Sequence, residues 1–260
     1  MSGRRKFAAG ALILAATLGS IHGCMAAAGD GEILVSAAIS LKNALAEIAS
    51  LYEKRTGVRV RFNLGASGLL QKQIETGAPV DVFASAGESQ MDALQAGGLI
   101  FADSRRNFAR NNLVLAVPVD LKSVVRSFKD LDRPEIKRIA IGNPKTVPVG
   151  QYTRELLINL KLWDKLQQRL VLAENSRQVL DYLVRGEADA GMVFASDMAV
   201  SGGEAIRAAT APENSHRPIV YPIAIVKESR RRGDAQPFID LIISAEGQAI
   251  LRKHGFLGHP

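Results

Sequence analysis

The sequence predicts an α/β protein built as two lobes, each with a central, mainly parallel sheet flanked by helices. Three observations lead to this fold class. From residue 33 onward, short apolar runs alternate with amphipathic stretches, as strands and helices do in a parallel sheet. The 260 residues exceed one small domain, yet no low-complexity linker or internal repeat divides them. The composition, 47% hydrophobic and 23% charged, is typical of a globular chain.

The first 28 residues have the pattern of an export signal. A basic cluster at 4–6 precedes an apolar run over 7–18, and three consecutive alanines end at Ala28. The apolar run is too short to span a bilayer comfortably, and small residues are typical of a cleavage site. We therefore expect a signal peptide over 1–28 and a periplasmic protein. The residues around Cys24 also resemble a lipoprotein cleavage box, in which case Cys24 would carry a lipid anchor.

The basic excess of the chain belongs partly to this leader. Lys and Arg number 33 against 26 Asp and Glu, a net charge of +7. Removal of residues 1–28 takes away three cations and no anion, which leaves +4. That modest charge does not require nucleic acid as a partner. One Cys and four His argue against a disulfide framework or a Cys/His metal site. We expect no nucleic-acid partner, no cofactor and no directly coordinated metal.

The first half of the exported chain alternates strand, helix, strand, helix. Apolar residues over 41–55 recur at helical spacing and Gly57 ends that helix, whereas residues 58–64 alternate as in a strand. The strands expected here are 33–38, 58–64 and 80–84, and the helices are 41–55, 68–75 and 88–96.

The second half repeats this order and closes with a long helix. The strands expected here are 112–117, 138–141, 170–173, 191–194 and 219–226, and the helices are 151–162, 176–186 and 236–254. Strands joined through helices in this way lie parallel, because the helix returns the chain to the same edge of the sheet.

Signals of catalysis are weak. The chain has no H-E-x-x-H, G-x-S-x-G, P-loop or G-x-G-x-x-G pattern, so we expect a protein that is not an enzyme. An exported serine hydrolase acting through Ser40 or Ser67 is the alternative, with His216 as its base. A regulatory effector domain with a basic surface at 230–232 is a further alternative, although an export signal argues against it.

Four expected helices begin directly after a strand, at Ser40, Ser67, Val149 and Ser176. A helix N-terminus carries unsatisfied N–H donors and partial positive charge, and parallel strands bring such ends to one edge. The sequence therefore predicts an anion site there. The other interpretation is that the three serines are ordinary N-caps. Glycines follow Ser67 and Val149, and we expect them to let backbone approach the ligand closely.

These loops offer donors and few carboxylates. Such a site suits an oxyanion without a proton at neutral pH, because a protonated oxygen would need an acceptor. Molybdate, tungstate and sulfate meet this condition, whereas phosphate, which is partly protonated, meets it less well.

Several segments resemble the molybdate-binding proteins of ABC importers. They are 36–45 (SAAISLKNAL), 73–83 (QIETGAPVDVF), 142–152, 191–197 and 221–224, and they follow one another along nearly the whole chain. The resemblance implies a type II periplasmic binding protein. In that fold two α/β lobes, joined by two crossover segments, close on a tetrahedral oxyanion, here molybdate or tungstate.

The resemblance also implies which residues bind the anion. Ser40 and Ser67 would donate hydroxyl and backbone N–H groups, and Val149 and Ser176 would donate backbone N–H groups. Phe194 stands where the family has a tyrosine whose hydroxyl reaches the oxyanion, so one donor is lost. Phe194 fits equally well as a core aromatic at a strand end. Molybdenum would be bound as an oxyanion and not by direct coordination.

For this fold we expect lobe 1 over 29–110, completed by 219–260, and lobe 2 over 111–218. The implied partners are the oxyanion and the membrane permease of an importer, and we expect a monomer. Binding of sulfate or another oxyanion is the alternative, since cavity size separates these ligands and cannot be read from a sequence.

Overall fold

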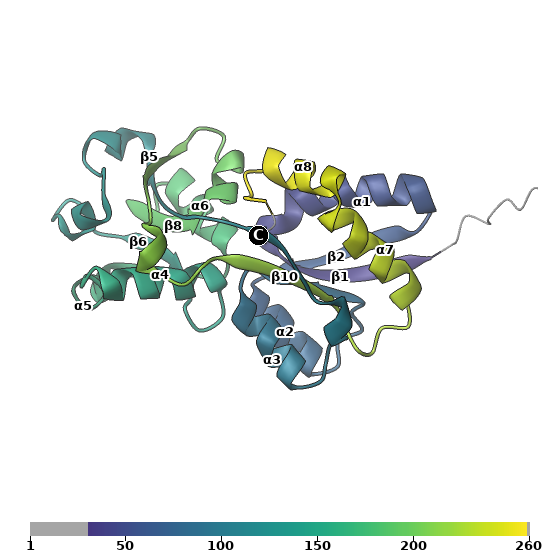
Figure 1. Ribbon diagram of the computed structural model, residues 1–260. Coiled ribbons are helices and arrows are strands. Elements are labelled where there is room, and N and C mark those ends of the chain that lie inside the picture. Colours follow the sequence, from purple (N-terminus) through teal and green to yellow (C-terminus); the bar gives the residue numbers. More distant parts are fainter. Residues whose placement is uncertain (1–30, 259–260) are drawn as a thin grey trace, which may run out of the picture.

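The computed structural model describes residues 31–258, which form two lobes with a five-stranded sheet in each. Figure 1 shows the lobes next to each other, connected by long segments that pass between them. The predicted signal peptide over 1–28, with Cys24, lies outside the described residues. Within residues 31–258, no helix is long and apolar enough to cross a membrane.

The first sheet has the strand order β2-β1-β3-β10-β4. Strand β1 pairs in parallel with β2 and with the central strand β3, whereas β10 pairs antiparallel with β3 and β4. The strands are β1 (Glu32–Ala38), β2 (Arg59–Gly65), β3 (Val82–Ala84), β4 (Arg106–Arg110) and β10 (Val220–Ile225).

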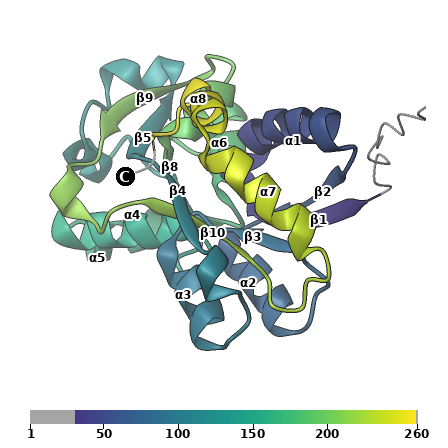
Figure 2. The same cartoon turned by 45° about the vertical axis from the view of Figure 1, so that its right-hand side comes forward.

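Helices cover both faces of this sheet. In Figure 2, α1, α7 and α8 lie over one face, and α2 and α3 lie over the other. They are α1 (Lys42–Thr56), α2 (Ser67–Glu75), α3 (Glu88–Ala96), α7 (Arg232–Ile243) and α8 (Ala245–Lys253). As predicted, Gly57 ends α1 with a φ of 74° in the left-handed region, which a glycine adopts without steric cost.

The single helix expected over 236–254 is wrong, because the chain forms two helices there. Ser244 is extended between α7 and α8, and its hydroxyl accepts a 3.2 Å hydrogen bond from the N–H of Gly247. An extended, hydrogen-bonded serine ends one helix and caps the next, and periodicity alone does not reveal such a break.

The second sheet has the order β7-β6-β8-β5-β9, with β6 parallel to β7 and β8, and β5 antiparallel to β8 and β9. Figure 1 places α4 and α6 on opposite sides of it. The strands are β5 (Leu113–Pro118), β6 (Ile139–Gly142), β7 (Leu170–Ala173), β8 (Ala190–Phe194) and β9 (Ala205–Thr210), and the helices are α4 (Pro148–Asn159), α5 (Trp163–Leu166) and α6 (Ser176–Val184).

Each sheet is mainly parallel, which confirms the predicted fold class. The strand that runs against the other four is the one that enters from the other lobe, β5 in one sheet and β10 in the other. The sequence did not predict β4 and β9. Both are edge strands, and their exposed arginines interrupt the apolar pattern by which a buried strand is recognised.

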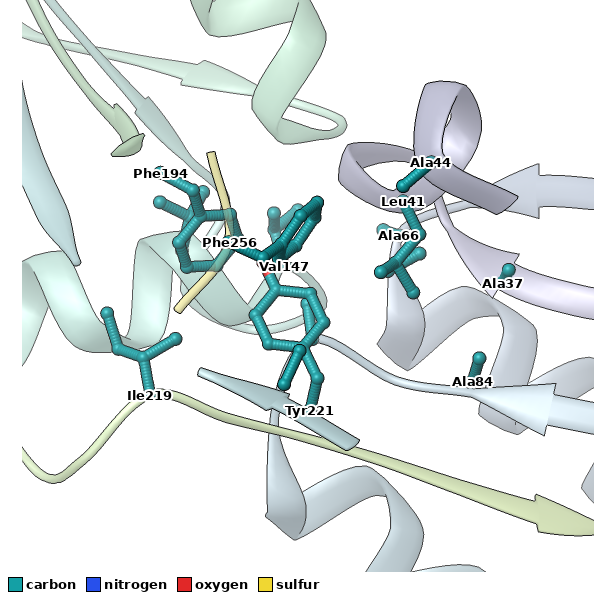
Figure 3. Close-up of a cluster of buried hydrophobic side chains, with 14 of the residues drawn as sticks. Ala37, Leu41, Ala44, Ala66, Ala84, Val147, Phe194, Ile219, Tyr221 and Phe256 are labelled. Atoms are coloured by element: carbon teal, nitrogen blue, oxygen red, sulfur yellow. The ribbon is translucent and has the colours of Figure 1, made fainter. Parts of the chain in front are cut away.

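The hydrophobic core continues from one lobe into the other. One cluster of buried side chains includes Leu41 beside α1, Val147 beside α4, Phe194, Tyr221 and Phe256. Figure 3 shows these side chains gathered where the lobes meet. The chain crosses between the lobes after β4, through Asn111 and Asn112, and returns over 211–219. The polar groups described next are therefore set in a closely packed region.

Candidate oxyanion site

A small cavity of about 10 Å³ lies between the lobes, with room for roughly one water-sized sphere. Larger hollows of up to about 550 Å³ lie elsewhere, for example around Trp163. Unlike the hollow around Trp163, the small cavity is lined by residues at helix N-termini of both lobes, and none of its lining residues is charged. Its lining consists of Ala38, Ile39, Ser40, Gly65, Ala66, Ser67, Ala86, Val147, Pro148, Asn175, Ser176 and Phe194.

The serines at the helix starts are not N-caps. Ser40 lies in a 3-10 turn, Ile39–Leu41, and the N-cap residue of α1 is Leu41. Ser67 is the first residue of α2, after Ala66. The hydrocarbon side chains of Leu41 and Ala66 cannot accept from first-turn N–H groups, and in α2 the N–H groups of Gly68 and Leu69 donate to backbone carbonyls instead. The N-cap interpretation is therefore wrong for Ser40 and Ser67.

Ser176 is not an N-cap either, because its neighbour Asn175 has that position. Asn175 Oδ1 accepts a 3.0 Å hydrogen bond from the N–H of Gln178. Ser176 is thus the first residue of α6, and it lines the cavity 3% exposed. One first-turn donor of α6 is satisfied by Asn175, and the earlier ones can face an anion.

The hydroxyl of Ser67 can donate into the cavity. Its Oγ accepts a 3.0 Å hydrogen bond from the N–H of Ala86, and the residue is fully buried. A hydroxyl has one hydrogen and two lone pairs, so an oxygen that already accepts keeps its hydrogen for another partner. Both Ser67 and Ala86 line the cavity, and that hydrogen is available to an anion there.

Val149 is buried in the first turn of α4, but its side chain does not line the cavity. It packs beside Gly142 of β6, while Val147 and Pro148 form the lining. The N-cap of α4 is Val147, which has no side-chain oxygen to cap the helix. The start of α4 thus meets the cavity through Val147 and Pro148.

The glycines after Ser67 and Val149 were expected to let backbone approach the ligand, but they lie against other backbone segments instead. The N–H of Gly68 donates a 3.0 Å hydrogen bond across the lobes to the carbonyl oxygen of Thr146. A Cβ on Gly150 would collide with the carbonyl of Gly142 in β6. Both glycines therefore allow backbone segments to approach one another, and neither is among the residues that line the cavity.

A buried ion pair lies behind the start of α6. Arg177 Nε is 2.9 Å from Oδ1 of Asp197, which is fully buried, and the N–H of Phe194 donates to its Oδ2 at 3.2 Å. Burial raises the pKa of Asp197, whereas Arg177 and a hydrogen bond from the Ser176 hydroxyl oppose that rise. Ser176 lines the cavity at the first residue of α6, where its backbone N–H can face an anion. The guanidinium keeps this region from being negative.

Phe194 is both a core aromatic and a wall of the cavity. Its ring is 2% exposed and contacts Tyr152 and Tyr221 edge to face, with centroids 6.4 and 5.7 Å apart. Figure 3 shows it close to Tyr221 and Val147. A phenyl ring has no donor, so this wall offers apolar contact alone.

Sequence reasoning missed Tyr221 and Asn111. The Tyr221 hydroxyl lies 3.2 Å from Ser40 Oγ and accepts a 3.3 Å hydrogen bond from Asn111 Nδ2. Tyr221 belongs to a strand that is otherwise apolar, and periodicity does not distinguish its hydroxyl. The available signal was chemical, because a buried tyrosine hydroxyl requires a hydrogen-bond partner.

Within residues 31–258, the geometry does not place His216 as a base for the serines. His216 Nδ1 lies 2.7 Å from the carbonyl oxygen of Arg217, and its ring packs on Tyr152 with centroids 5.8 Å apart. His216 is not among the residues lining the cavity. Ser40 and Ser67 bond instead to Tyr221 and to a backbone N–H.

Two α/β lobes that are linked by two crossings, with helix starts from both lobes around one cavity, define the class: a type II periplasmic binding fold. A family model described as bacterial extracellular solute-binding protein matches residues 33–257. The chain belongs to this family, whose members are located outside the cytoplasm.

Relatives align over most of their own length. The chain is 40% identical over 225 residues to the putative ABC transporter substrate-binding lipoprotein YvgL of Bacillus subtilis, which covers 86% of this chain and 85% of that protein. It is 35% identical to the molybdate-binding protein ModA of Escherichia coli, with 89% and 91% covered.

Solved structures agree with this relationship. The periplasmic molybdate-binding protein of Azotobacter vinelandii superimposes with a TM-score of 0.78 at 30% identity, covering 86% of this chain and 98% of that one. The sulfate-binding protein SubI of Mycobacterium tuberculosis superimposes with a TM-score of 0.75 at 16% identity, covering 87% and 86%. The second likeness shows the fold alone.

Proposed function

We propose that this protein captures molybdate, and tungstate with it, and delivers the anion to the membrane permease of an ABC importer. The observation that carries the proposal is the cavity between the lobes, lined by serine hydroxyls and helix starts and by no charged residue. Helix N-termini and hydroxyls bind an anion through dipoles, without a cation in the cavity. The binding residues proposed are Ser40, Ser67, Val149, Ser176 and Phe194.

The donor set favours an anion that carries no proton. The Ser67 oxygen already accepts from Ala86, so its hydroxyl donates, as does every backbone N–H at a helix start. A protonated ligand oxygen would face a donor and lose a hydrogen bond, at a cost of about 1–3 kcal/mol. Phosphate is disfavoured on these grounds.

Sulfate is the second candidate, because it presents the same doubly charged set of acceptors. The proteins named for molybdate are related at 30–35% identity and cover most of the chain. The solved sulfate-binding protein shares only the fold, at 16% identity. This difference supports molybdate.

The remaining features of the proposal concern the protein's setting. We infer a non-catalytic binding protein, since Ser40 and Ser67 bond to Tyr221 and to a backbone N–H instead of a base. We also expect this protein to be a monomer in the periplasm. A lipid anchor at Cys24 is supported by the lipoprotein among the relatives. The permease is the expected protein partner.

Thermal unfolding of the purified chain with and without anions tests the proposal. Saturation at a hundredfold excess over Kd adds about 2.7 kcal/mol of stability. For a chain of this size that raises Tm by about 5–10 °C. We expect this shift with micromolar molybdate and tungstate, and a much smaller one with sulfate or phosphate. No shift with any of the four anions would refute an oxyanion function, and a larger shift with sulfate would favour the second candidate.

A further inference from the structure

A chain of buried side chains connects the crossover region to Ser40. Asn111, between β4 and β5, donates from Nδ2 to the hydroxyl of Tyr221 at 3.3 Å, and that hydroxyl lies 3.2 Å from Ser40 Oγ. All three residues are at most 5% exposed. Water therefore cannot substitute freely for any of these contacts, and the direction of each hydrogen bond is set by the protein.

The orientation of the Asn111 amide is fixed at its far side. Oδ1 faces the backbone N–H groups of Asn112 at 2.9 Å and Ser196 at 3.4 Å. A backbone N–H can only donate, so the oxygen must stand there and the NH₂ group must face the other way. Its two hydrogens go to Ser196 Oγ, at 2.8 Å, and to Tyr221.

That orientation determines the direction of the next bond. Asn111 can only donate to the Tyr221 hydroxyl, so the buried phenol hydrogen needs an acceptor elsewhere, and among the described residues Ser40 Oγ is the other hydrogen-bond partner of this hydroxyl. Burial raises the pKa of Tyr221 far above its usual value, so the phenol keeps its hydrogen at any working pH. Ser40 Oγ then accepts, and its own hydrogen is left for the cavity that it lines.

We propose that Tyr221 is a positioning and specificity residue that makes Ser40 a hydrogen-bond donor toward the bound oxyanion. The inference rests on the proposed function and adds a residue outside the cavity lining. Asn111 and Tyr221 do for Ser40 what the N–H of Ala86 does for Ser67. With both hydroxyls turned to donate, the cavity disfavours an oxygen that carries a proton.

Isothermal titration with molybdate on a double-mutant cycle tests the proposal. Tyr221→Phe keeps the ring and its edge-to-face contacts with Phe194 and Phe256, and removes the hydroxyl. We expect it to weaken molybdate binding about tenfold, because Ser40 is then free to rotate. In a Ser40→Ala background the same substitution should change Kd by less than about twofold. An equal loss in both backgrounds would overturn the proposal, since Tyr221 would then act by packing.

Displacement of molybdate by phosphate gives a second measurement, because a change in packing alone would not alter the ratio of the two affinities. In Tyr221→Phe the Ser40 oxygen can turn and accept, so phosphate should compete relatively better than in the wild type. An unchanged ratio of phosphate to molybdate affinity would overturn the proposal, and this ratio decides the matter if Ser40→Ala leaves no measurable binding.

Tyr52→Phe is the matched control. Its hydroxyl is also buried and donates to the carbonyl of Asp234 at 2.7 Å, away from the cavity. We expect a lower Tm with molybdate affinity unchanged. Failure of the wild type to bind any oxyanion would refute the proposed function itself. Wild-type binding with full affinity retained in Tyr221→Phe would refute the positioning role alone.

Discussion

Gly68 stands where α2 of the first lobe touches the second lobe. Its N–H donates to the carbonyl oxygen of Thr146 at 3.0 Å. A Cβ added at Gly68 would overlap that oxygen and lie 3.0 Å from the carbonyl carbon and Cα of Thr146. Gly68→Ala therefore places a methyl group against the backbone of the other lobe, which cannot move aside as a flexible side chain would.

The expected cost follows from these two contacts. Loss of the hydrogen bond removes about 1 kcal/mol. Accommodating the overlap costs about 1–3 kcal/mol more, as is typical of an inserted methyl in a packed region. With the lobes held together by ligand, the sum weakens binding by roughly thirtyfold to several hundredfold. With the lobes apart the overlap is absent, and alanine in a helix is favoured over glycine by about 1 kcal/mol.

The two effects have opposite signs and can be measured separately. Isothermal titration should show the loss of molybdate affinity, while thermal unfolding without ligand should show an equal or higher Tm for Gly68→Ala. Gly233→Ala is the matched control, a glycine in the first turn of α7 with open space around its Cβ position. It should raise Tm slightly and leave the affinity unchanged.

Wild-type affinity in Gly68→Ala would refute the reasoning. It would mean that the contact between α2 and Thr146 is not part of the ligand-bound arrangement. A fall in Tm without ligand, as large as the loss on binding, would mean that the contact supports the fold and not closure on the anion.

Three further substitutions test the site. Phe194→Tyr should tighten molybdate binding at least about tenfold in calorimetry, because a donor is added at a wall that has none. Ser67→Ala should weaken binding about tenfold or more and lower stability by about 1–3 kcal/mol in denaturant unfolding, since the N–H of Ala86 loses its buried acceptor. Arg177→Met should lower stability at neutral pH by about 3–5 kcal/mol, because Asp197 is left buried without its partner. That last loss should shrink at acid pH: burial raises the pKa of Asp197 in the folded state, so the folded variant binds a proton more tightly than the unfolded chain and its stability falls as pH rises through the folded pKa.

Exposed residues provide controls for these variants. Ser50→Ala and Arg185→Met alter exposed side chains at α1 and α6 and should change neither affinity nor stability by more than about 0.5 kcal/mol. Weaker binding by Phe194→Tyr would show that the ring cannot place a hydroxyl toward the anion. A pH-independent loss in Arg177→Met would mean that Asp197 does not titrate in the accessible range.

The alternation of strands and helices followed from local periodicity, and the structure reproduces most of it. Apolar spacing over a few residues reports which face of an element is buried, whatever the rest of the chain does. The end of α1 at Gly57 was likewise predictable from local sequence, because the left-handed conformation is required at that residue alone. Edge strands β4 and β9 escaped prediction because each is only partly buried.

The positions of four helix starts were also readable from the sequence, and Ser40, Ser67 and Ser176 meet at one cavity. The role of each serine could not be predicted from the sequence. Whether a serine caps its helix or faces a ligand depends on which residue occupies the N-cap, and Leu41, Ala66 and Asn175 hold those positions. The sequence by itself therefore determined at which residues these helices, with their N–H donors, begin.

Only the tertiary structure decided the direction of those donors. Ser40 and Tyr221 stand 181 residues apart, and Arg177 finds Asp197 on a different element. No periodic pattern encodes such pairs, because a hydrogen bond depends on atoms within about 3 Å once the chain has folded. The physical reason is one of range: local spacing fixes the elements, whereas the partner of each buried polar group is fixed by packing.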